Sequence, residues 1–229
     1  MKINSISKRL MTAVGFVRSG ARFADVGTDH GYLPIYLSKK GIVSCAVASD
    51  INEGPLESAR RNIRDNGVEG KVVTVLSDGL LGLREYAPTD IAIFGMGGEL
   101  VCRIIEESPW VKKDGIRLIL QPMTKQAETR KYLLDNGFSI VDEALSFDDG
   151  KIYQTICAEY SGMAEGYGEL ELMLGKVNIE RGEPLFYELV KKKIEVYSLR
   201  LDGLRRAGLG KEEERMLCKL EELLKEKRI

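Results

Sequence analysis

The feature that most constrains the fold is a regular alternation of strand-like and helix-like segments along the first two thirds of the chain. Short runs rich in β-branched residues alternate with amphipathic stretches, two of which end in an Asn-Gly pair. Strands joined by single helices favour a parallel sheet covered by helices on both faces. We expect strands at residues 22–27, 42–50, 71–77, 89–95 and 116–121, and helices at residues 32–40, 53–66, from about 98, and 125–136.

Two longer strand patterns follow, at residues 138–147 and 151–160. The segment Asp148-Asp149-Gly150 between them is a turn signal, so these strands should form an antiparallel hairpin. A parallel sheet that ends in such a hairpin resembles the Rossmann-like, seven-stranded sheet of methyltransferases. The fold class that we expect is therefore α/β.

Helical patterns flank this region. Apolar residues from Ile6 to Val17 recur at helical spacing, which predicts an N-terminal amphipathic helix capped by Ser5 or Ser7. Beyond Gly168 two apolar stripes, broken at residues 205–211, predict two antiparallel helices with a coiled-coil-like seam. The stripes contain Val190, Ile194, Tyr197, Leu201 and Leu204, and then Met216, Leu220 and Leu223.

We expect a catalytic domain over residues 1–160 and a helical, coiled-coil-like domain over residues 161–229. The helical domain would be either an accessory domain that holds RNA or a dimer interface. The oligomeric state that we expect is a monomer or a weak homodimer.

Composition limits the classes of partner. The net charge is −1, so no overall field attracts nucleic acid or an anionic membrane. Lys and Arg outnumber Asp and Glu by five in residues 1–40 and by three in residues 185–229, which permits a local RNA-binding patch. No stretch is long enough to span a bilayer. The four cysteines show no CxxC spacing, so we expect no metal, no disulfide framework and a cytoplasmic location.

Polar or glycine-rich segments follow each of the five parallel strands. Because the carboxyl ends of parallel strands share one edge of a sheet, these segments should converge there. In chain order they are Asp25-Val26-Gly27-Thr28-Asp29-His30-Gly31, Ser49-Asp50, Ser77-Asp78-Gly79, Gly95-Met96-Gly97-Gly98 and Gln121-Pro122.

The first three segments favour an adenosine cofactor. Glycines let backbone amides approach a ligand, Asp50 can accept both ribose hydroxyls, and Asp78-Gly79 can bind an adenine edge. The first loop has the spacing G-x-x-x-G instead of the dinucleotide pattern G-x-G-x-x-G. Its carboxylates, Asp25 and Asp29, would repel a pyrophosphate but suit an ammonium and a sulfonium. The pattern favours S-adenosylmethionine over NAD. Loop capping and tight helix–sheet packing are the alternative explanations of the single motifs.

Four segments together resemble the bacterial tRNA (adenine-22-N1) methyltransferase family. They read SKRL, ADVGTDHGYLPIYL, FGMGGEL and LILQPMTKQAETRKYLLDNGFSIVDEAL. The resemblance runs along essentially the whole catalytic domain, and the helical tail is similar to the C-terminal coiled-coil-like domain of that family. Gly31 departs from the alanine expected in many members.

The resemblance implies methyl transfer from S-adenosyl-L-methionine to N1 of adenine 22 in tRNA, with S-adenosyl-L-homocysteine as the product and no metal or membrane involved. The candidate catalytic residues are Asp29, His30 and Gln121. The candidate substrate-binding residues are Lys8, Tyr32, Gly97, Gly98 and Pro122. The candidate cofactor-binding residues are Arg9, Asp25, Gly27, Thr28, Gly31, Asp50, Ile51, Asp78, Gly79, Gly95 and Met96.

Three alternatives stay open at the level of sequence. The chain could methylate a small molecule or a protein with the same cofactor. It could be an inactive RNA-binding module on a methyltransferase fold, although Asp25, Gly27, Asp50 and Asp78 oppose that reading. NAD-dependent chemistry is the third, and the loop spacing disfavours it.

Overall fold

The computed structural model describes residues 3–205 and 209–226. The chain forms two compact units, Met1–Gly166 and Tyr167–Ile229, whereas the sequence placed the boundary at 160/161. The break expected between the two C-terminal helices includes residues 206–208, which lie outside the described residues.

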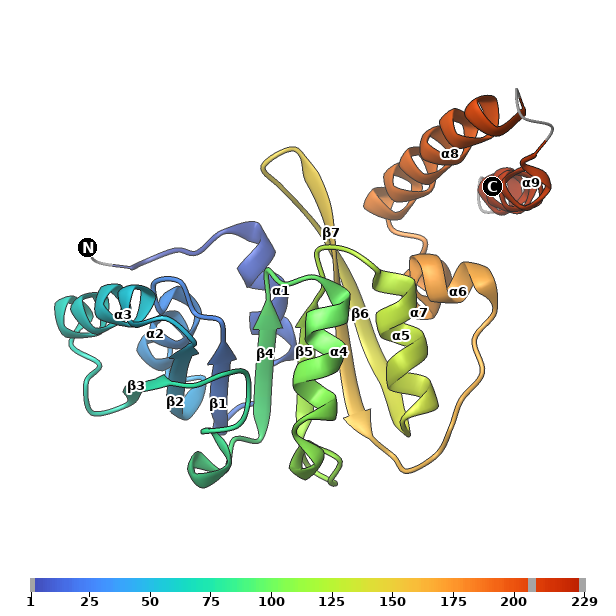
Figure 1. The fold of residues 1–229 in the computed structure, drawn as a ribbon. Helices are drawn as coiled ribbons and strands as arrows, with labels where there is room; N and C mark the ends of the chain where they lie inside the picture. Colours follow the sequence, from blue (N-terminus) through green and yellow to red (C-terminus); the bar gives the residue numbers. More distant parts are fainter. Residues whose placement is uncertain (1–2, 206–208, 227–229) are drawn as a thin grey trace. The chain divides into compact units, whose positions relative to one another are not determined.

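The first unit contains a seven-stranded sheet (Figure 1). Its strands are β1 (Ala21–Val26), β2 (Val43–Asp50), β3 (Val72–Leu76), β4 (Asp90–Phe94), β5 (Arg117–Gln121), β6 (Phe138–Asp148) and β7 (Lys151–Tyr160). They lie in the order β3-β2-β1-β4-β5-β7-β6. The first five strands are parallel, and β7 is antiparallel to both β5 and β6. The expected seven-stranded methyltransferase sheet is thus confirmed, and every strand end lies within one residue of its predicted place.

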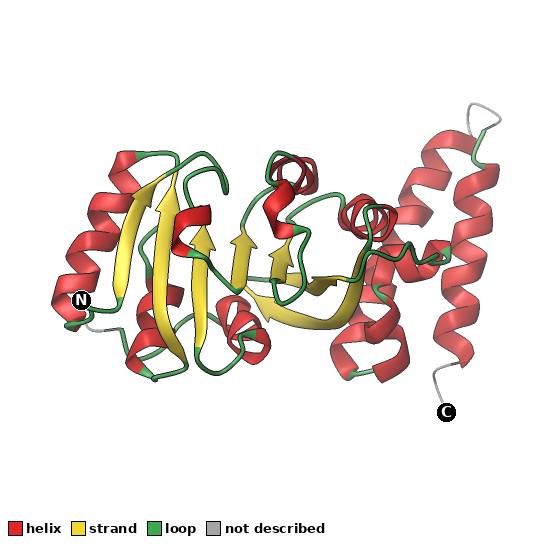
Figure 2. Ribbon diagram, turned by 90° about the horizontal axis from the view of Figure 1, so that it is seen from below, coloured by secondary structure: helices red, strands yellow, loops and turns green. Residues whose placement is uncertain are grey.

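Helices cover both faces of this sheet (Figure 2). One layer contains α1 (Lys8–Phe16), α2 (Tyr32–Lys39) and α3 (Glu53–Asn66), and the opposite layer contains α4 (Gly98–Glu106) and α5 (Gln126–Asp135). Strands β1, β4 and β5 are buried at nearly every position, because a sheet covered on both faces has no solvent-facing side. The reversal of strand order between β1 and β4 places the loops after these two strands at a topological switch point.

The N-terminal helix begins after Ser7, whose hydroxyl accepts a hydrogen bond from the Leu10 amide at 3.3 Å. This confirms one of the two predicted caps. Residues before the helix are held by polar contacts: the amide of Ile3 donates to Asn66 Oδ1 at 2.8 Å, and Lys39 Nζ donates to the Ile3 carbonyl at 2.8 Å. The segment from Ile3 to Ser7 therefore has a defined position in the first unit.

The second unit consists of helices. The predicted pair is confirmed as α8 (Pro184–Arg205) and α9 (Lys211–Glu226), which pack against each other. Val190, Leu201, Met216, Leu220 and Leu223 of the predicted stripes are buried. The sequence did not predict the short helices α6 (Glu169–Leu174) and α7 (Lys176–Arg181), nor the single turns η1 (Arg84–Tyr86) and η2 (Pro109–Val111). Segments of three to six residues are too short to show a helical period.

Among the described helices, none has both the length and the apolar character needed to cross a membrane. Within the same residues, no group of three or more His, Cys, Asp or Glu side chains is arranged to hold a metal ion.

Candidate active site at the carboxyl edge of the sheet

The loop after β1 is tied to the end of β2. The amides of Gly27 and Thr28 both donate to the carbonyl of Ser49, at 2.9 and 2.8 Å, and the Ser49 hydroxyl donates to the Asp25 carbonyl at 3.2 Å. Gly27 has φ +76°, a left-handed conformation that favours glycine. A Cβ atom at Gly27 would overlap the Cε of Met96, so the side chain of Met96 lies directly over this loop.

Asp25 is the buried carboxyl group of the site. Its Oδ2 accepts a 2.7 Å hydrogen bond from the Thr28 hydroxyl. Burial raises the pKa of Asp25 to about 6, while the Thr28 hydrogen bond and the positive charge of Arg9 act in the opposite direction and the charge of Asp50 adds to the rise. A cationic group placed beside Asp25 would therefore be stabilised by its carboxylate.

A cavity of about 600 Å³ opens at this edge, beside Asp25. One wall is the loop after β1, and the opposite wall is the N-terminal segment with the start of α1. Seven of the predicted site residues line it, namely Arg9, Asp25, Gly27, Thr28, Asp29, His30 and Tyr32. The other lining residues are Ile3, Ser5, Ile6, Ser7, Leu10, Leu33 and Phe94.

Arg9 reaches this cavity from α1 and is held by the β6–β7 hairpin. Its amide donates to Asp148 Oδ2 at 3.3 Å, and its guanidinium lies over the ring of Tyr153 at 5.5 Å from the centroid. A Cβ atom at Gly95 would lie 3.6 Å from Arg9 Nη1, so the guanidinium also borders the loop after β4. Arg9 thus brings the first helix and two loops of the sheet edge together.

Asp29 and His30 form a pair at the mouth of the cavity. His30 Nε2 lies 3.2 Å from Asp29 Oδ2, and the His30 ring lies 5.1 Å from the ring of Tyr32. The Asp29 side chain is 80% exposed and that of His30 is 38% exposed. Both side chains are therefore accessible to a large substrate, unlike Asp25.

The remaining candidates lie outside the cavity lining. Asp50 ends β2, where its Oδ1 accepts from the Asn52 amide at 2.8 Å, and the Asp50 carbonyl accepts from the Ser77 amide at 2.9 Å. This bond joins the ends of β2 and β3, so Asp50 and Asp78 share one stretch of the edge. The others outside the lining are Lys8, Gly31, Ile51, Gly79, Gly95, Met96, Gly97, Gly98, Gln121 and Pro122.

Gln121 occupies a different environment from the one expected of a residue that contacts a substrate. Its side chain is buried, and Nε2 donates to Thr155 Oγ1 at 2.8 Å, while Oε1 has no hydrogen-bond partner among the described residues. The Thr155 hydroxyl lies 2.9 Å from Thr12 Oγ1, which donates to the Arg9 carbonyl at 2.7 Å. This chain of polar groups joins the end of β5 to the backbone of Arg9.

Close packing explains Gly98. A Cβ atom there would lie 2.7 Å from the Thr124 carbonyl oxygen and 2.8 Å from that of Lys125. Sequence patterns did not single out Thr12, Tyr153 or Thr155, since these residues stand in ordinary helix and strand patterns. Only the tertiary fold brings Tyr153 to Arg9, and Thr155 to Gln121 and Thr12. In the N-terminal wall of the cavity, Arg9 was expected from the sequence, whereas Ile3, Ser5 and Ile6 were not.

The sheet order, the closing hairpin and the cavity over β1 define a methyltransferase. Residues 6–156 match the Methyltransferase domain family, which is about two thirds of the chain. The chain is 34% identical over 170 residues to the tRNA (adenine(22)-N(1))-methyltransferase of Bacillus subtilis, a match that covers 74% of this chain and 71% of that protein. The chain therefore belongs to the tRNA (adenine(22)-N(1))-methyltransferase family.

Solved structures agree with this assignment along nearly the whole chain. The Streptococcus pneumoniae protein Sp1610, solved with S-adenosyl-L-methionine, is 32% identical with a TM-score of 0.87, covering 96% of this chain and 100% of that chain. The structure of the Bacillus subtilis m1A22 tRNA methyltransferase is 28% identical with a TM-score of 0.82, covering 97% of this chain and 98% of that one. The likeness thus includes the helical second unit as well as the sheet.

Proposed function

We propose that this protein transfers the methyl group of S-adenosyl-L-methionine to N1 of adenine 22 in tRNA. The observation that carries the proposal is the cavity beside Asp25, at the switch point of the sheet, in a member of this enzyme family. Because the substrate is tRNA, we place the reaction in the cytoplasm and take tRNA as the partner.

The residues at the cavity fit a cofactor that carries both an ammonium and a carboxylate. A volume of about 600 Å³ lies within the range of small-molecule sites. The buried carboxyl group of Asp25 suits a cationic ligand, and Arg9 at the opposite wall suits the ligand carboxylate. We assign Asp50 to the ribose hydroxyls and Asp78 to the adenine edge, since both lie at the ends of neighbouring strands.

When bound, the cofactor supplies a methyl group that is already activated by its sulfonium. The task of the protein is therefore to place adenine N1 in line with the methyl–sulfur bond. Fixing both reactants in such a geometry can contribute roughly 7–11 kcal/mol. We assign Tyr32 and the backbone of Gly97 to the adenine ring, since Tyr32 lines the cavity and glycine leaves its backbone open to a flat group.

The methylated ring is cationic until the N6 amine loses a proton. We assign the acceptor role to the Asp29–His30 pair, because both side chains are exposed at the mouth of the cavity and lie within hydrogen-bonding distance of each other. An acceptor close to N6 stabilises this charge as it develops. Gln121 takes a positioning role instead, since its side chain is buried and holds Thr155, which in turn contacts the α1 residue Thr12.

A tRNA base that is paired or stacked must leave its contacts to enter the cavity. We assign the RNA phosphates to Lys8 on the first helix and to the basic run Lys191-Lys192-Lys193 on α8, which predicts binding that weakens with salt. Replacing the three lysines by Gln should raise the KM for tRNA several-fold and leave the affinity for S-adenosylhomocysteine unchanged. Three charge-removing changes at Lys40, Arg61 and Lys71 on the first unit are the matched control.

The direct test is to incubate the protein with labelled S-adenosyl-L-methionine and unmodified tRNA, followed by mass spectrometry of the nucleosides. We expect one N1-methyladenosine for each tRNA and none in a tRNA that carries guanosine at position 22. Methylated guanosine, or N6-methyladenosine formed without rearrangement of an N1-methyl product, would contradict the proposal.

A further inference from the structure

A second cavity lies at the opposite edge of the sheet, where the parallel strands begin. Its volume is about 580 Å³. One wall is the segment that follows η1 and the other is the segment that joins η2 to β5. We call it the amino-edge pocket. Its lining residues are Arg22, Arg84, Ala87, Pro88, Thr89, Pro109, Trp110, Lys112, Lys113, Asp114, Gly115 and Ile116.

The amino-edge pocket concentrates positive charge on a protein whose net charge is −1. Four of its lining residues are Lys or Arg and one is Asp. Arg84 and Lys113 are exposed, and within residues 3–205 and 209–226 their side chains form no hydrogen bond or ion pair. Two cationic groups are therefore available to an anionic ligand, whereas Arg22 and Lys112 are engaged by the protein, with the Ala87 carbonyl and Asn136 respectively.

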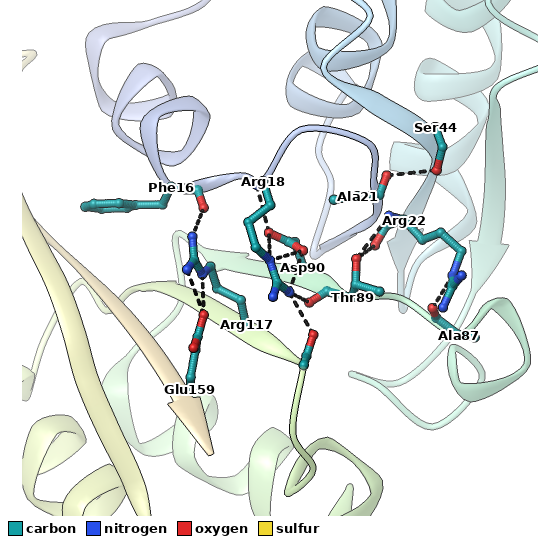
Figure 3. A network of polar contacts seen from close by, with 11 residues as sticks. Phe16, Arg18, Ala21, Arg22, Ser44, Ala87, Thr89, Asp90, Arg117 and Glu159 are labelled. Carbon is teal, nitrogen blue, oxygen red and sulfur yellow. Dashed lines mark hydrogen bonds and ion pairs between the residues drawn. The ribbon is translucent and has the colours of Figure 1, made fainter. Parts of the chain in front are cut away.

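Hydrogen bonds from Arg18 join the two walls (Figure 3). Arg18 Nη2 donates to the Thr89 carbonyl of one wall at 2.6 Å and to the Gly115 carbonyl of the other wall at 2.8 Å. The same guanidinium pairs with the buried carboxylate of Asp90 at 2.8 Å. Arg22 Nε donates to the Ala87 carbonyl at 2.6 Å. The protein's own groups thus hold the walls in place, which reduces the ordering cost of binding.

The backbone of one wall is held in an uncommon conformation. Ala87 has φ +44°, in the left-handed region that non-glycine residues rarely adopt, and Pro88 follows it. Such conformations persist where the surrounding structure imposes them, and they cluster at functional sites. The bond from Arg22 to the Ala87 carbonyl holds this turn in place.

Trp110 gives the amino-edge pocket a flat apolar surface. It is the single tryptophan of the chain and is half-buried on η2, between Pro109 and the basic residues Lys112 and Lys113. Aromatic side chains next to cationic ones are the combination that holds a nucleotide, with its base stacked on the ring and its phosphate on the cations. Guanidinium groups match phosphate geometry with two parallel hydrogen bonds.

We infer that the amino-edge pocket binds a nucleotide, with its phosphate against Arg84 and Lys113 and its base against Trp110. Its volume suits a ligand of that size. The five residues of β4 and of β5 separate the two edges by roughly 17 Å, so this nucleotide is not the one that reacts. The nucleotide comes either from the free pool or from a part of the tRNA far from adenine 22.

The fluorescence of Trp110 tests the inference in the full-length protein, because no other tryptophan contributes. S-adenosylhomocysteine is kept saturating, so that the first cavity is filled, and AMP, adenosine or tRNA is then titrated. We expect saturable quenching by AMP and none by adenosine at the same concentrations, since adenosine lacks the phosphate. Quenching by tRNA without quenching by AMP would assign the site to a nucleotide within RNA.

The variant Arg84→Gln/Lys113→Gln removes the two cations without touching the core, because both side chains are exposed. We expect its apparent dissociation constant for the quenching ligand to rise at least tenfold, while its affinity for S-adenosylhomocysteine stays unchanged. The control Arg61→Gln/Lys71→Gln removes the same charge elsewhere. The inference is wrong if neither AMP nor tRNA alters the emission, or if both double variants respond like the parent protein. Neither outcome bears on methylation of adenine 22, which is measured separately.

Discussion

The hydroxyl of Thr28 donates a 2.7 Å hydrogen bond to the carboxylate of Asp25. This bond and the charge of Arg9 oppose the burial that raises the pKa of Asp25 to about 6. The carboxyl group therefore changes its charge just below neutral pH, in the wall of the cavity that we assign to a cationic cofactor.

The affinity for S-adenosyl-L-methionine should fall as the pH drops from 7.5 to 5. Protonation of Asp25 removes the negative charge that faces the cofactor, since its pKa of about 6 lies within this range. Calorimetry at several pH values measures the effect. The variant Asp25→Asn should bind about tenfold more weakly at pH 7.5 and lose most of the pH dependence. An Asp25→Asn variant that keeps the parent pH profile would show that another group is responsible.

The same carboxyl group should make the parent protein less stable, relative to an Asp25→Asn variant, as the pH rises. A folded-state pKa of about 6 lies above the ordinary value of 3.8, so the contribution of Asp25 to stability is fully present below pH 4 and is lost through pH 6. The shift of about two units corresponds to about 3 kcal/mol. Urea unfolding at pH 4.5 and pH 8 measures the free energy of unfolding of the parent protein and of Asp25→Asn. The stability of the variant relative to the parent should be greater at pH 8 than at pH 4.5. An equal difference at both pH values would contradict this.

Replacing Thr28 by Val should raise the pKa of Asp25 further, because the hydrogen bond that stabilises the carboxylate is removed. The pH at which the cofactor affinity is halfway between its limits should then rise by up to about one pH unit. Thr28→Ser keeps the hydroxyl and should behave like the parent protein. If the Val and Ser variants show the same midpoint, the hydrogen bond does not set the charge of Asp25.

Gly27→Ala should weaken cofactor binding more than tenfold. The left-handed φ of +76° costs a non-glycine residue about 1–2 kcal/mol, and the new Cβ atom overlaps Met96 Cε. Adding Met96→Ala removes the overlap but leaves the backbone strain. We expect the double variant to recover part of the affinity of Gly27→Ala, measured by calorimetry. No recovery would mean that the backbone conformation accounts for the whole loss.

A fully buried ion pair supports the hairpin that holds Arg9. Arg130 Nε donates to Glu143 Oε1 at 2.7 Å, and Arg130 Nη2 donates to Gln154 Oε1 at 2.8 Å. Arg130→Met leaves the Glu143 carboxylate buried without this cation. The free energy of unfolding, measured in urea, should therefore fall by about 3–5 kcal/mol. The double variant Arg130→Met/Glu143→Leu should lose clearly less stability than the single variant Arg130→Met. A double variant that is as unstable as Arg130→Met would indicate that packing, not charge, dominates.

The sequence alone determined the sheet and its active edge. Periodicity and turn residues predict each strand to within one residue. The central strands are buried on both faces and leave an apolar run that polar residues bound, and the turn at Asp149-Gly150 bounds β6 and β7. The same rule places Asp25, Asp50 and Asp78 at strand ends, and parallel strands bring such ends together. Family motifs then point to the reaction.

Only the tertiary structure decided what surrounds these residues. Asp25 faces a cavity whose other wall is the first helix and the N-terminal segment, and no local pattern records that arrangement. Gln121, which the sequence offers as a catalytic group, is buried because β7 supplies Thr155 beside it. The amino-edge pocket likewise needs Arg18 to join two loops far apart in the chain. Side-chain environment is set by contacts between distant segments, whereas strand and helix positions are set by neighbours in the sequence.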